Sequence, residues 1–248
     1  MNTNIVNKIQ NSLIIKSKYF FVVSNYIIGL SFFFFLFFSS IGLGLGLRLY
    51  DNTDLQQGDY FKILFIHVPC AWTCIWIYII MCICSILYYI FKYPFCALAS
   101  LPMYYLGLFF TFITLITGSL WGYPTWGSYW VWDVRLTSVL ILFFFYLCYG
   151  VIRFSFKNSE KGSRMGALFI IIGTLNIPVI KYSVSWWNTL HQPASMSFNV
   201  MSFLDMNLIM ALVFIIISLF FFSLIITLYT LQFEIHQYKY NKLKTFYI

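Results

Sequence analysis

Six long runs of apolar residues, separated by short polar segments, constrain this chain more than any other feature of its sequence. A bilayer core of about 30 Å is crossed by about 20 apolar residues in a helix, and each run meets or approaches that length. The chain is 61% hydrophobic and 9% charged, whereas a soluble domain carries roughly 25% charged residues. We therefore predict an all-α membrane protein, a polytopic bundle of six transmembrane helices forming one integral domain over residues 1–248. The expected spans are 20–47, 68–91, 98–120, 136–152, 166–180 and 204–231.

The distribution of Lys and Arg predicts how these spans are oriented. If the N-terminus is inside, eleven of the fifteen basic residues fall in inner segments, and outer segments hold only Arg48, Lys62, Arg135 and Lys181. Short cytoplasmic or matrix loops carry such an excess, so both termini are expected on that side. The net charge of +8 therefore reflects membrane topology. No soluble segment gathers a basic patch of the kind that binds nucleic acid, so the expected surroundings are a lipid membrane.

A tryptophan-rich external loop is predicted at residues 121–135, where Gly122 and Pro124 favour turns over helix. It holds half of the chain's eight tryptophans, two tyrosines and two charged residues, and its candidate site residues are Trp121, Trp126, Tyr129, Trp130, Trp132, Asp133 and Arg135. Tryptophan and tyrosine gather at membrane interfaces, but six aromatic residues in twelve are also typical of a platform for a flat apolar ligand. The residues alone leave both interpretations open. Arg135 suits a carboxylate, because guanidinium binds carboxylate in a bidentate way.

Two histidines lie in the other outer segments. His67 comes just before Pro69, and a proline in the first turn predicts that the second span starts near Val68. His191 follows the pair Trp186 and Trp187 and comes just before Gln192 and Pro193. Each histidine taken alone could be hydrogen-bonded to a neighbouring loop or exposed at the surface.

Together the two histidines share one side of the predicted membrane with six of the eight tryptophans. Haem iron needs one or two axial ligands, and imidazole is a usual one. The pattern therefore favours haem, with a quinone or another flat apolar ligand as the alternative. Because the chain has no Cys-x-x-Cys-His sequence, it does not attach a c-type haem itself. A bound haem would be b-type, non-covalent and transient.

The segment from Trp126 to Ser138 resembles the tryptophan-rich "WWD" signature of haem-handling proteins. With the segments Ile66–Pro69 and Trp186–Gln192, it makes nearly the whole chain similar to the cytochrome c maturation protein C family. The resemblance implies that His67 and His191 are axial ligands of haem iron. It also implies a haem platform that includes Trp126, Trp130, Trp132 and Asp133, to which we add Trp121, Tyr129, Arg135, Trp186 and Trp187. Tyr129 stands where many members are expected to have tryptophan, and Pro193 where bacterial members often have glycine.

The resemblance further implies a role in the maturation of c-type cytochromes. The family presents haem at the outer face of its membrane to a haem chaperone, cytochrome c maturation protein E, beside an ABC-type complex with other maturation subunits. Such a chain binds and delivers haem and is not an enzyme. Pro193 and the bias towards Phe, Ile, Tyr, Asn and Lys favour a mitochondrial inner membrane with both termini in the matrix. A bacterial inner membrane is the alternative.

Three other functions are compatible with a six-span chain. A cytochrome-b-like subunit places its histidines inside the spans, whereas neither outer histidine is mid-span here. A transporter usually needs ionisable groups or broken helices near the membrane midplane, and Asn176 before Pro178 is the one candidate break. A structural subunit of a membrane assembly that binds no haem is the third alternative.

Overall fold

The computed structural model describes residues 3–48, 58–156, 159–187, 189–191 and 206–247, and all regular structure within them is helical. Six helices are long and apolar enough to cross a membrane, with α5 and α6 together counting as one span. This confirms the prediction of an all-α polytopic membrane protein. The elements are α1 (Thr3–Arg48), the 3-10 helix η2 (Gly58–Ile63), α2 (Leu64–Phe91), α3 (Pro94–Trp126), α4 (Val134–Ser155), α5 (Ser159–Gly173), α6 (Asn176–Trp186) and α8 (Met206–Tyr247).

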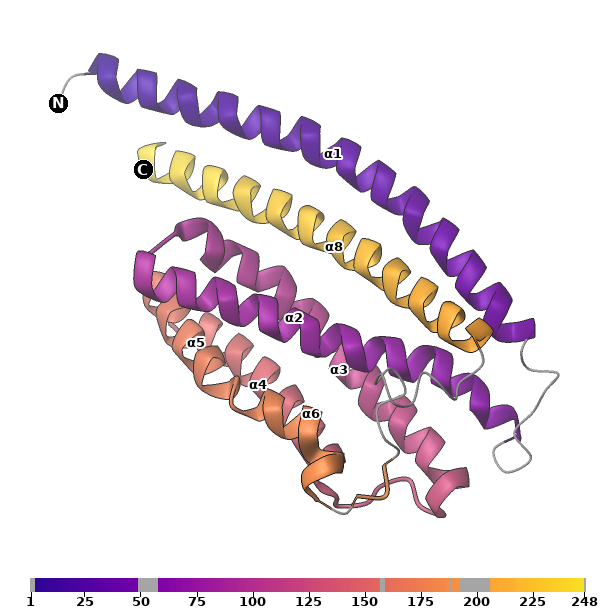
Figure 1. Ribbon diagram of the computed structural model, residues 1–248. Coiled ribbons are helices and arrows are strands. Elements are labelled where there is room, and N and C mark those ends of the chain that lie inside the picture. The colour runs from indigo at the N-terminus through magenta and orange to yellow at the C-terminus, as the bar shows by residue number, and fades with distance from the viewer. Residues whose placement is uncertain (1–2, 49–57, 157–158, 188, 192–205, 248) are drawn as a thin grey trace.

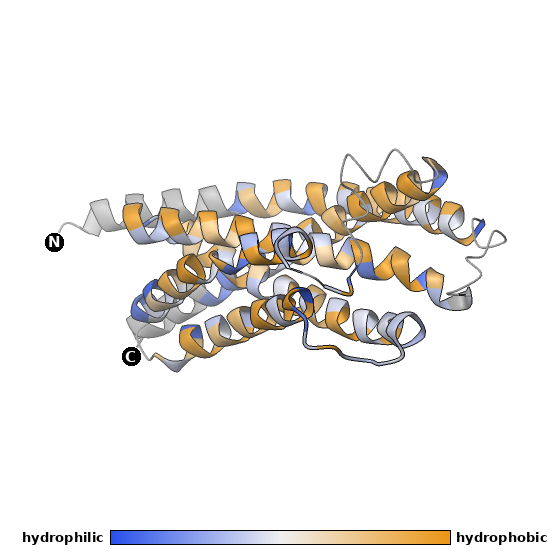
Figure 2. Cartoon of the chain, turned by 60° about the horizontal axis from the view of Figure 1, so that its bottom comes forward, coloured by the Kyte–Doolittle hydropathy of each residue, from blue (hydrophilic) through white to orange (hydrophobic). Residues whose placement is uncertain are grey.

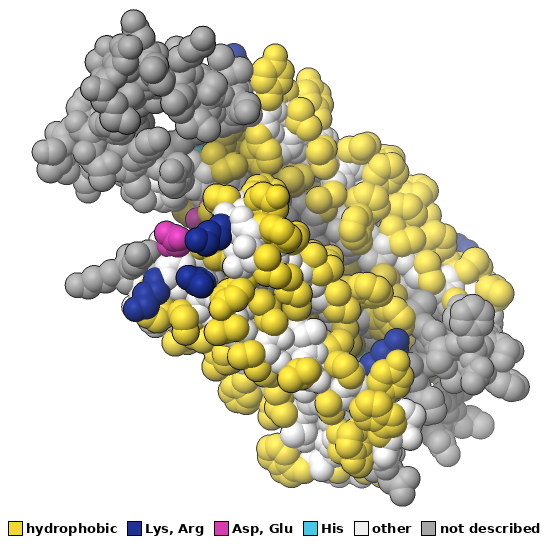
Figure 3. Space-filling model, turned by 60° about the vertical axis from the view of Figure 1, so that its left-hand side comes forward, with side chains coloured by type: hydrophobic (Ala, Val, Ile, Leu, Met, Phe, Trp, Pro, Cys, Tyr) yellow, Lys and Arg dark blue, Asp and Glu magenta, His cyan; other side chains and the backbone are white. Residues whose placement is uncertain are grey.

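The helices form layers (Figure 1). α1 packs mainly along α8, and α8 also contacts α2 and α3, which pack on each other as a helical hairpin. α4 and α5 cover the opposite side of this hairpin, and α6 packs on α4. The start of α1 and the end of α8 lie at the same end of the bundle. Hydrophobic residues follow the helices along much of their length (Figure 2), and hydrophobic side chains cover most of the face seen in Figure 3. A surface of this kind suits contact with lipid.

α1 is held to α8 by stacked phenylalanine rings. The ring of Phe221 lies 5.1 Å from that of Phe34 and 6.0 Å from that of Phe38, with both pairs stacked. Each such pair contributes about 0.5–1.5 kcal/mol beyond the area that it buries. The outward face of α1 stays exposed, and Tyr26 on it is 77% exposed.

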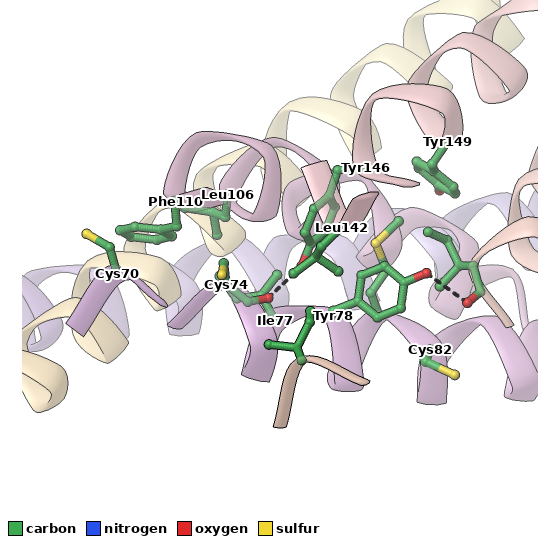
Figure 4. Close-up of a cluster of buried hydrophobic side chains, with 13 residues drawn as sticks. Cys70, Cys74, Ile77, Tyr78, Cys82, Leu106, Phe110, Leu142, Tyr146 and Tyr149 are labelled. Carbon is green, nitrogen blue, oxygen red and sulfur yellow. Dashed lines mark hydrogen bonds between the residues drawn. The ribbon is translucent and has the colours of Figure 1, made fainter. Parts of the chain in front are cut away.

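The main core lies between α2, α3, α4 and α5, and it is crossed by two buried tyrosine hydroxyls (Figure 4). Tyr146 on α4 donates to the carbonyl oxygen of Cys74 on α2 at 2.7 Å. Tyr78 on α2 donates to the carbonyl oxygen of Ile170 on α5 at 3.0 Å. Both tyrosines are fully buried, so these hydrogen bonds fix how the helices are aligned along their length.

Two predicted boundaries near the outer loops differ from the structure. Helix α2 begins at Leu64 rather than near Val68, so His67 lies in its first turn and Pro69 lies inside the helix. Pro69 is inside the helix, so it removes the hydrogen bond that an N–H at this position would make to the carbonyl oxygen of Phe65.

The prediction that Gly122 and Pro124 end the helix before residue 121 is wrong, because α3 continues to Trp126. The helix ends instead at Gly127, whose φ of 75° is left-handed and favours glycine. Gly122 is buried within about 3.1 Å of the Trp126 ring, measured from where a Cβ would stand. Packing of the aromatic residues thus overrides local propensity, and the irregular segment shrinks from 121–135 to 127–133. Trp126 and Trp130 are consequently separated by the helix end and are not neighbours on one helix.

The fifth span is broken where the sequence has Asn176 and Pro178. α5 ends at Gly173, Thr174 and Leu175 form a turn, and α6 starts at Asn176. The Asn176 side chain donates to the carbonyl oxygen of Ser138 on α4 at 2.8 Å. This bond anchors α6 on α4 and so sets the position from which the chain approaches His191.

Candidate functional site

A cavity opens where the start of α2, the end of α3, the start of α4 and α6 come together. It encloses about 1140 Å³ of empty space, its open mouth included. Its lining is mainly apolar and aromatic, with a few polar side chains. The residues of the sequence prediction that line it are His67, Trp121, Trp126, Trp130, Arg135 and His191.

The cavity exists because α3 presents small side chains towards it. Thr114, Gly118, Ser119 and Gly122 recur at helical spacing along the lining face of α3, and Ala71 of α2 also lines the cavity. Larger side chains at these positions would occupy the space. The wall beyond them carries the aromatic rings of Trp72 and the α3 tryptophans.

His67 is held by the end of α3. Its Nδ1 lies 3.0 Å from the Thr117 hydroxyl oxygen, and its ring makes an edge contact with Trp121 at 5.8 Å between centroids. A Cβ atom at Gly118 would lie only 3.0 Å from His67 Cε1. Three residues of α3, namely Thr117, Gly118 and Trp121, therefore fix the position of the His67 ring.

His191 reaches the same cavity from the other side. It lies in the irregular segment after α6, and its ring is 6.3 Å from the ring of Trp126. His191 and Arg135 both lie within electrostatic range of His67. Each histidine thus contacts a different tryptophan from the last two turns of α3.

Arg135 and Trp130 supply the polar donors of the site. Arg135 is partly buried in the first turn of α4, and its Nη1 donates to the carbonyl oxygen of Ile180 on α6 at 3.3 Å. The buried indole Nε1 of Trp130 has no hydrogen-bond partner among the described residues. A guanidinium with further donors and an unpaired indole N–H, both lining one cavity, are suited to the carboxylate of a ligand.

Comparison with known proteins assigns the chain to a family. Residues 12–245 match the family model described as "CcmC: Heme exporter protein C". The chain is 51% identical over 145 residues to a "Putative cytochrome c biosynthesis ccmC-like mitochondrial protein" of Marchantia polymorpha, and this alignment covers 58% of the chain and 61% of that protein. It is 41% identical over 189 residues to "Heme exporter protein C" of Bradyrhizobium diazoefficiens, with 75% of the chain and 71% of the relative covered.

The chain belongs to the heme exporter protein C family. A protein of Arabidopsis thaliana with the same printed name as the Marchantia relative is 46% identical over 158 residues, which are 64% of the chain and 58% of that protein. The chain therefore spans about three fifths of the length of these two relatives in its alignments. The family resemblance predicted from the motifs is confirmed.

Five residues of the predicted platform do not line the cavity of this family member. Trp132 is 76% exposed and makes an edge contact with Trp130, and Tyr129 stacks on Tyr123 at 4.6 Å. Trp186 and Trp187 contact each other at 5.7 Å and are also exposed. Such positions suit aromatic residues at a membrane interface.

Asp133, the fifth of them, is the N-cap of α4, and its Oδ1 accepts from the backbone N–H of Leu136 at 2.7 Å. This cap fixes where α4 starts and so where Arg135 lies.

Thr117, Gly118 and Trp72 contribute to the site but were not predicted. Thr117 and Gly118 lie in the third span, where nothing in the sequence distinguishes them from ordinary small residues of a membrane helix. Their spacing of three to four residues from Trp121 was the available signal. Trp72 follows His67 by five residues, whereas neighbours on one helix face are three or four residues apart, so helical spacing did not place it beside the histidine.

One cysteine, Cys74, lines this cavity, and no Asp or Glu side chain of the described residues does. All six cysteines are free, and four of them are buried in the bundle. Within the described residues no three His, Cys, Asp or Glu side chains are grouped as a metal-ion site.

Proposed function

We propose that this chain binds haem in the cavity and presents it for transfer to a haem chaperone during cytochrome c maturation. The observation that carries the proposal is that His67 and His191, which come from different segments, line one cavity together with four tryptophans. Iron in haem accepts imidazole at one or both axial positions. Membership in the heme exporter protein C family supports the same ligand.

The character of the cavity fits haem as cargo. A flat apolar macrocycle matches the walls formed by Trp121, Trp126 and Trp130, because aromatic rings bury large areas against planar ligands. The two propionates of haem match the donors of Arg135 and Trp130. Since the sequence has no Cys-x-x-Cys-His, the haem would be b-type and non-covalent. Imidazole ligation is reversible, so binding of this kind permits release, and no bond of the cargo needs to be made or broken by this chain.

The membrane and the partners follow from the same proposal. Two relatives carry "mitochondrial" in their names, and this supports a mitochondrial inner membrane, with a bacterial inner membrane as the alternative. The bias of Lys and Arg supports both termini on the matrix side, so the cavity would open towards the intermembrane space. The receiving partner would be cytochrome c maturation protein E. An ABC-type complex of maturation subunits would accompany the chain.

An absorption spectrum tests the binding step. We expect the purified protein to show the Soret band of six-coordinate haem, and His67→Ala and His191→Ala each to lose it while still inserting in the membrane. His236→Ala is the matched control, because this third histidine lies exposed on α8 against Phe21, away from the cavity lining. A wild-type spectrum in either cavity variant would contradict that ligand assignment.

Transfer is tested separately. Haem-loaded protein in nanodiscs, mixed with the purified chaperone, should lose its haem band as the chaperone gains one. If the loaded protein keeps its haem at every chaperone concentration, the delivery step is wrong although the binding step stands.

A further inference from the structure

The hydrogen bond between His67 and Thr117 determines which nitrogen of His67 carries the proton. His67 Nδ1 lies 3.0 Å from Thr117 Oγ1. The Thr117 hydroxyl has one proton, and it is directed at the carbonyl oxygen of Ile113 at 2.7 Å, one turn back on α3. The Thr117 oxygen can then only accept from the imidazole. Nδ1 is therefore the protonated nitrogen of neutral His67, and Nε2 keeps its lone pair.

The distances from Gly118 show which edge of the His67 ring faces α3. A Cβ at Gly118 would lie 3.0 Å from Cε1, 3.5 Å from Nδ1 and 4.0 Å from Nε2 of His67. The edge formed by Nδ1 and Cε1 thus faces α3 at this point, and Nε2 is the ring nitrogen farther from it. Trp121, one turn further along α3, limits rotation of the ring by its edge contact.

We propose that Thr117 is a positioning residue that holds His67 as the Nδ1–H tautomer, with Nε2 as its coordinating nitrogen. Gly118 leaves the space that this orientation requires. Histidines that bind metal usually donate their second ring N–H to a fixed acceptor, which sets the tautomer and raises the basicity of the coordinating nitrogen. A side-chain hydroxyl already saturated by its own helix serves here as that acceptor. Coordination of haem iron by Nε2 rests on the proposed function, whereas the protonation of Nδ1 does not.

The tautomer is measured without haem. The chain has three histidines, so ¹⁵N-histidine labelling gives a simple spectrum in which His67→Ala identifies the His67 signals. We expect Nδ1 of His67 protonated and Nε2 unprotonated in the wild-type protein. Thr117→Val, which keeps the shape of the side chain, should give a mixture of tautomers, and Thr117→Ser should restore the wild-type signals.

Haem binding supplies the second readout. We expect Thr117→Val to weaken haem affinity about tenfold and to shift the reduction potential, and Thr117→Ser to recover both. Outer hydrogen-bond partners of metal ligands are typically worth 10–100-fold. The lower end is expected, because the backbone of Thr114 also bonds to the imidazole.

The matched control is Thr111→Val. Thr111 makes the same kind of bond to its own helix, at 2.6 Å to the carbonyl oxygen of Gly107, and it does not line the cavity. It should change neither the His67 signals nor the potential.

Two results overturn the inference: a wild-type His67 protonated on Nε2, or a Thr117→Val spectrum identical to wild type. If the tautomer is as expected and no form of the protein binds haem, the proposed function fails while the role of Thr117 stands.

Discussion

The two histidines of the cavity are held in different ways. His67 lies in the first turn of a long helix, and the Thr117, Gly118 and Trp121 side of α3 fixes its ring. His191 lies in an irregular segment beyond the short helix α6, and the ring contact seen for it is with Trp126. Helices position ligands more rigidly than irregular segments do. If both histidines bind haem as proposed, we expect His67 to be the fixed ligand and His191 the one exchanged on transfer.

The largest expected effect tests this division directly. His67→Ala and His191→Ala should each weaken haem binding by more than 100-fold, because each would remove a proposed axial ligand. Imidazole added to the solution should restore six-coordinate haem in His191→Ala, where the replaced ring stands on an irregular segment. It should restore little in His67→Ala, where α3 encloses the ring position. Equal rescue of the two variants, seen in a titration by absorption, would remove the distinction.

The next effect concerns Arg135, which connects the cavity to the His191 side through its bond to Ile180 of α6. Arg135→Gln should lower haem affinity by about 10–100-fold, since a hydrogen bond to a charged group contributes about 1.5–3 kcal/mol. The ¹⁵N signals of His67 should not change.

The dimethyl ester of haem isolates the part due to carboxylate binding. It should bind wild type and Arg135→Gln with nearly equal affinity. Lys181→Gln is the matched control, because this basic residue on α6 is exposed and does not line the cavity. If Arg135→Gln loses as much affinity for the ester as it loses for haem, relative to wild type, Arg135 acts through helix packing alone.

A moderate effect is expected on the His67 side from Gly118→Ala. The added methyl group would stand 3.0 Å from His67 Cε1 and must displace the ring by a few tenths of an ångström. We expect haem affinity to fall about tenfold, as for other changes in the second shell of a metal ligand. Gly44→Ala on α1 is the control, because a Cβ there meets nothing within 4 Å among the described residues. Equal haem affinities of the two variants, measured by titration, would show that haem binding tolerates a displacement of the His67 ring.

The smallest effects are expected at Trp130 and Trp132, and they test how far the site extends along the tryptophan-rich segment. Trp130→Phe keeps an aromatic ring but removes the unpaired buried N–H, and we expect a loss of affinity of about tenfold, the lower end for a hydrogen bond to a carboxylate. Trp132→Phe, made at a ring that is 76% exposed, should lose less. A larger loss at Trp132, measured in the same titration, would extend the site to the full platform that the family resemblance implies.

The sequence predicted the class of fold for a physical reason, and six of the eleven residues predicted for the site line the cavity. A chain whose solvent is lipid must satisfy its backbone within each span, so long apolar runs become helices. The six spans follow from that rule alone. Residues as uncommon as His67, His191 and the tryptophans of the 121–135 segment stand out in such a background. Their joint occurrence therefore indicated a ligand before any geometry was known.

Boundaries and second contacts were decided by tertiary packing. Pro69, Gly122 and Pro124 favour helix ends by local propensity, yet helix continues through all three positions because neighbouring rings and helices stabilise it. The break at Asn176 was visible in the sequence, but its bond to Ser138 on α4 was not.

The sequence by itself determined that this protein is a membrane bundle with three histidines and eight tryptophans, since composition and periodicity are properties of the chain alone. Only the tertiary structure decided that Trp121, Trp126 and Trp130 line the cavity and Trp132, Trp186 and Trp187 do not. It alone set Thr117 beside His67. The reason is that these contacts join the start of α2 to the end of α3, and the pairing of residues across a helical hairpin depends on how both helices rotate and slide as they pack.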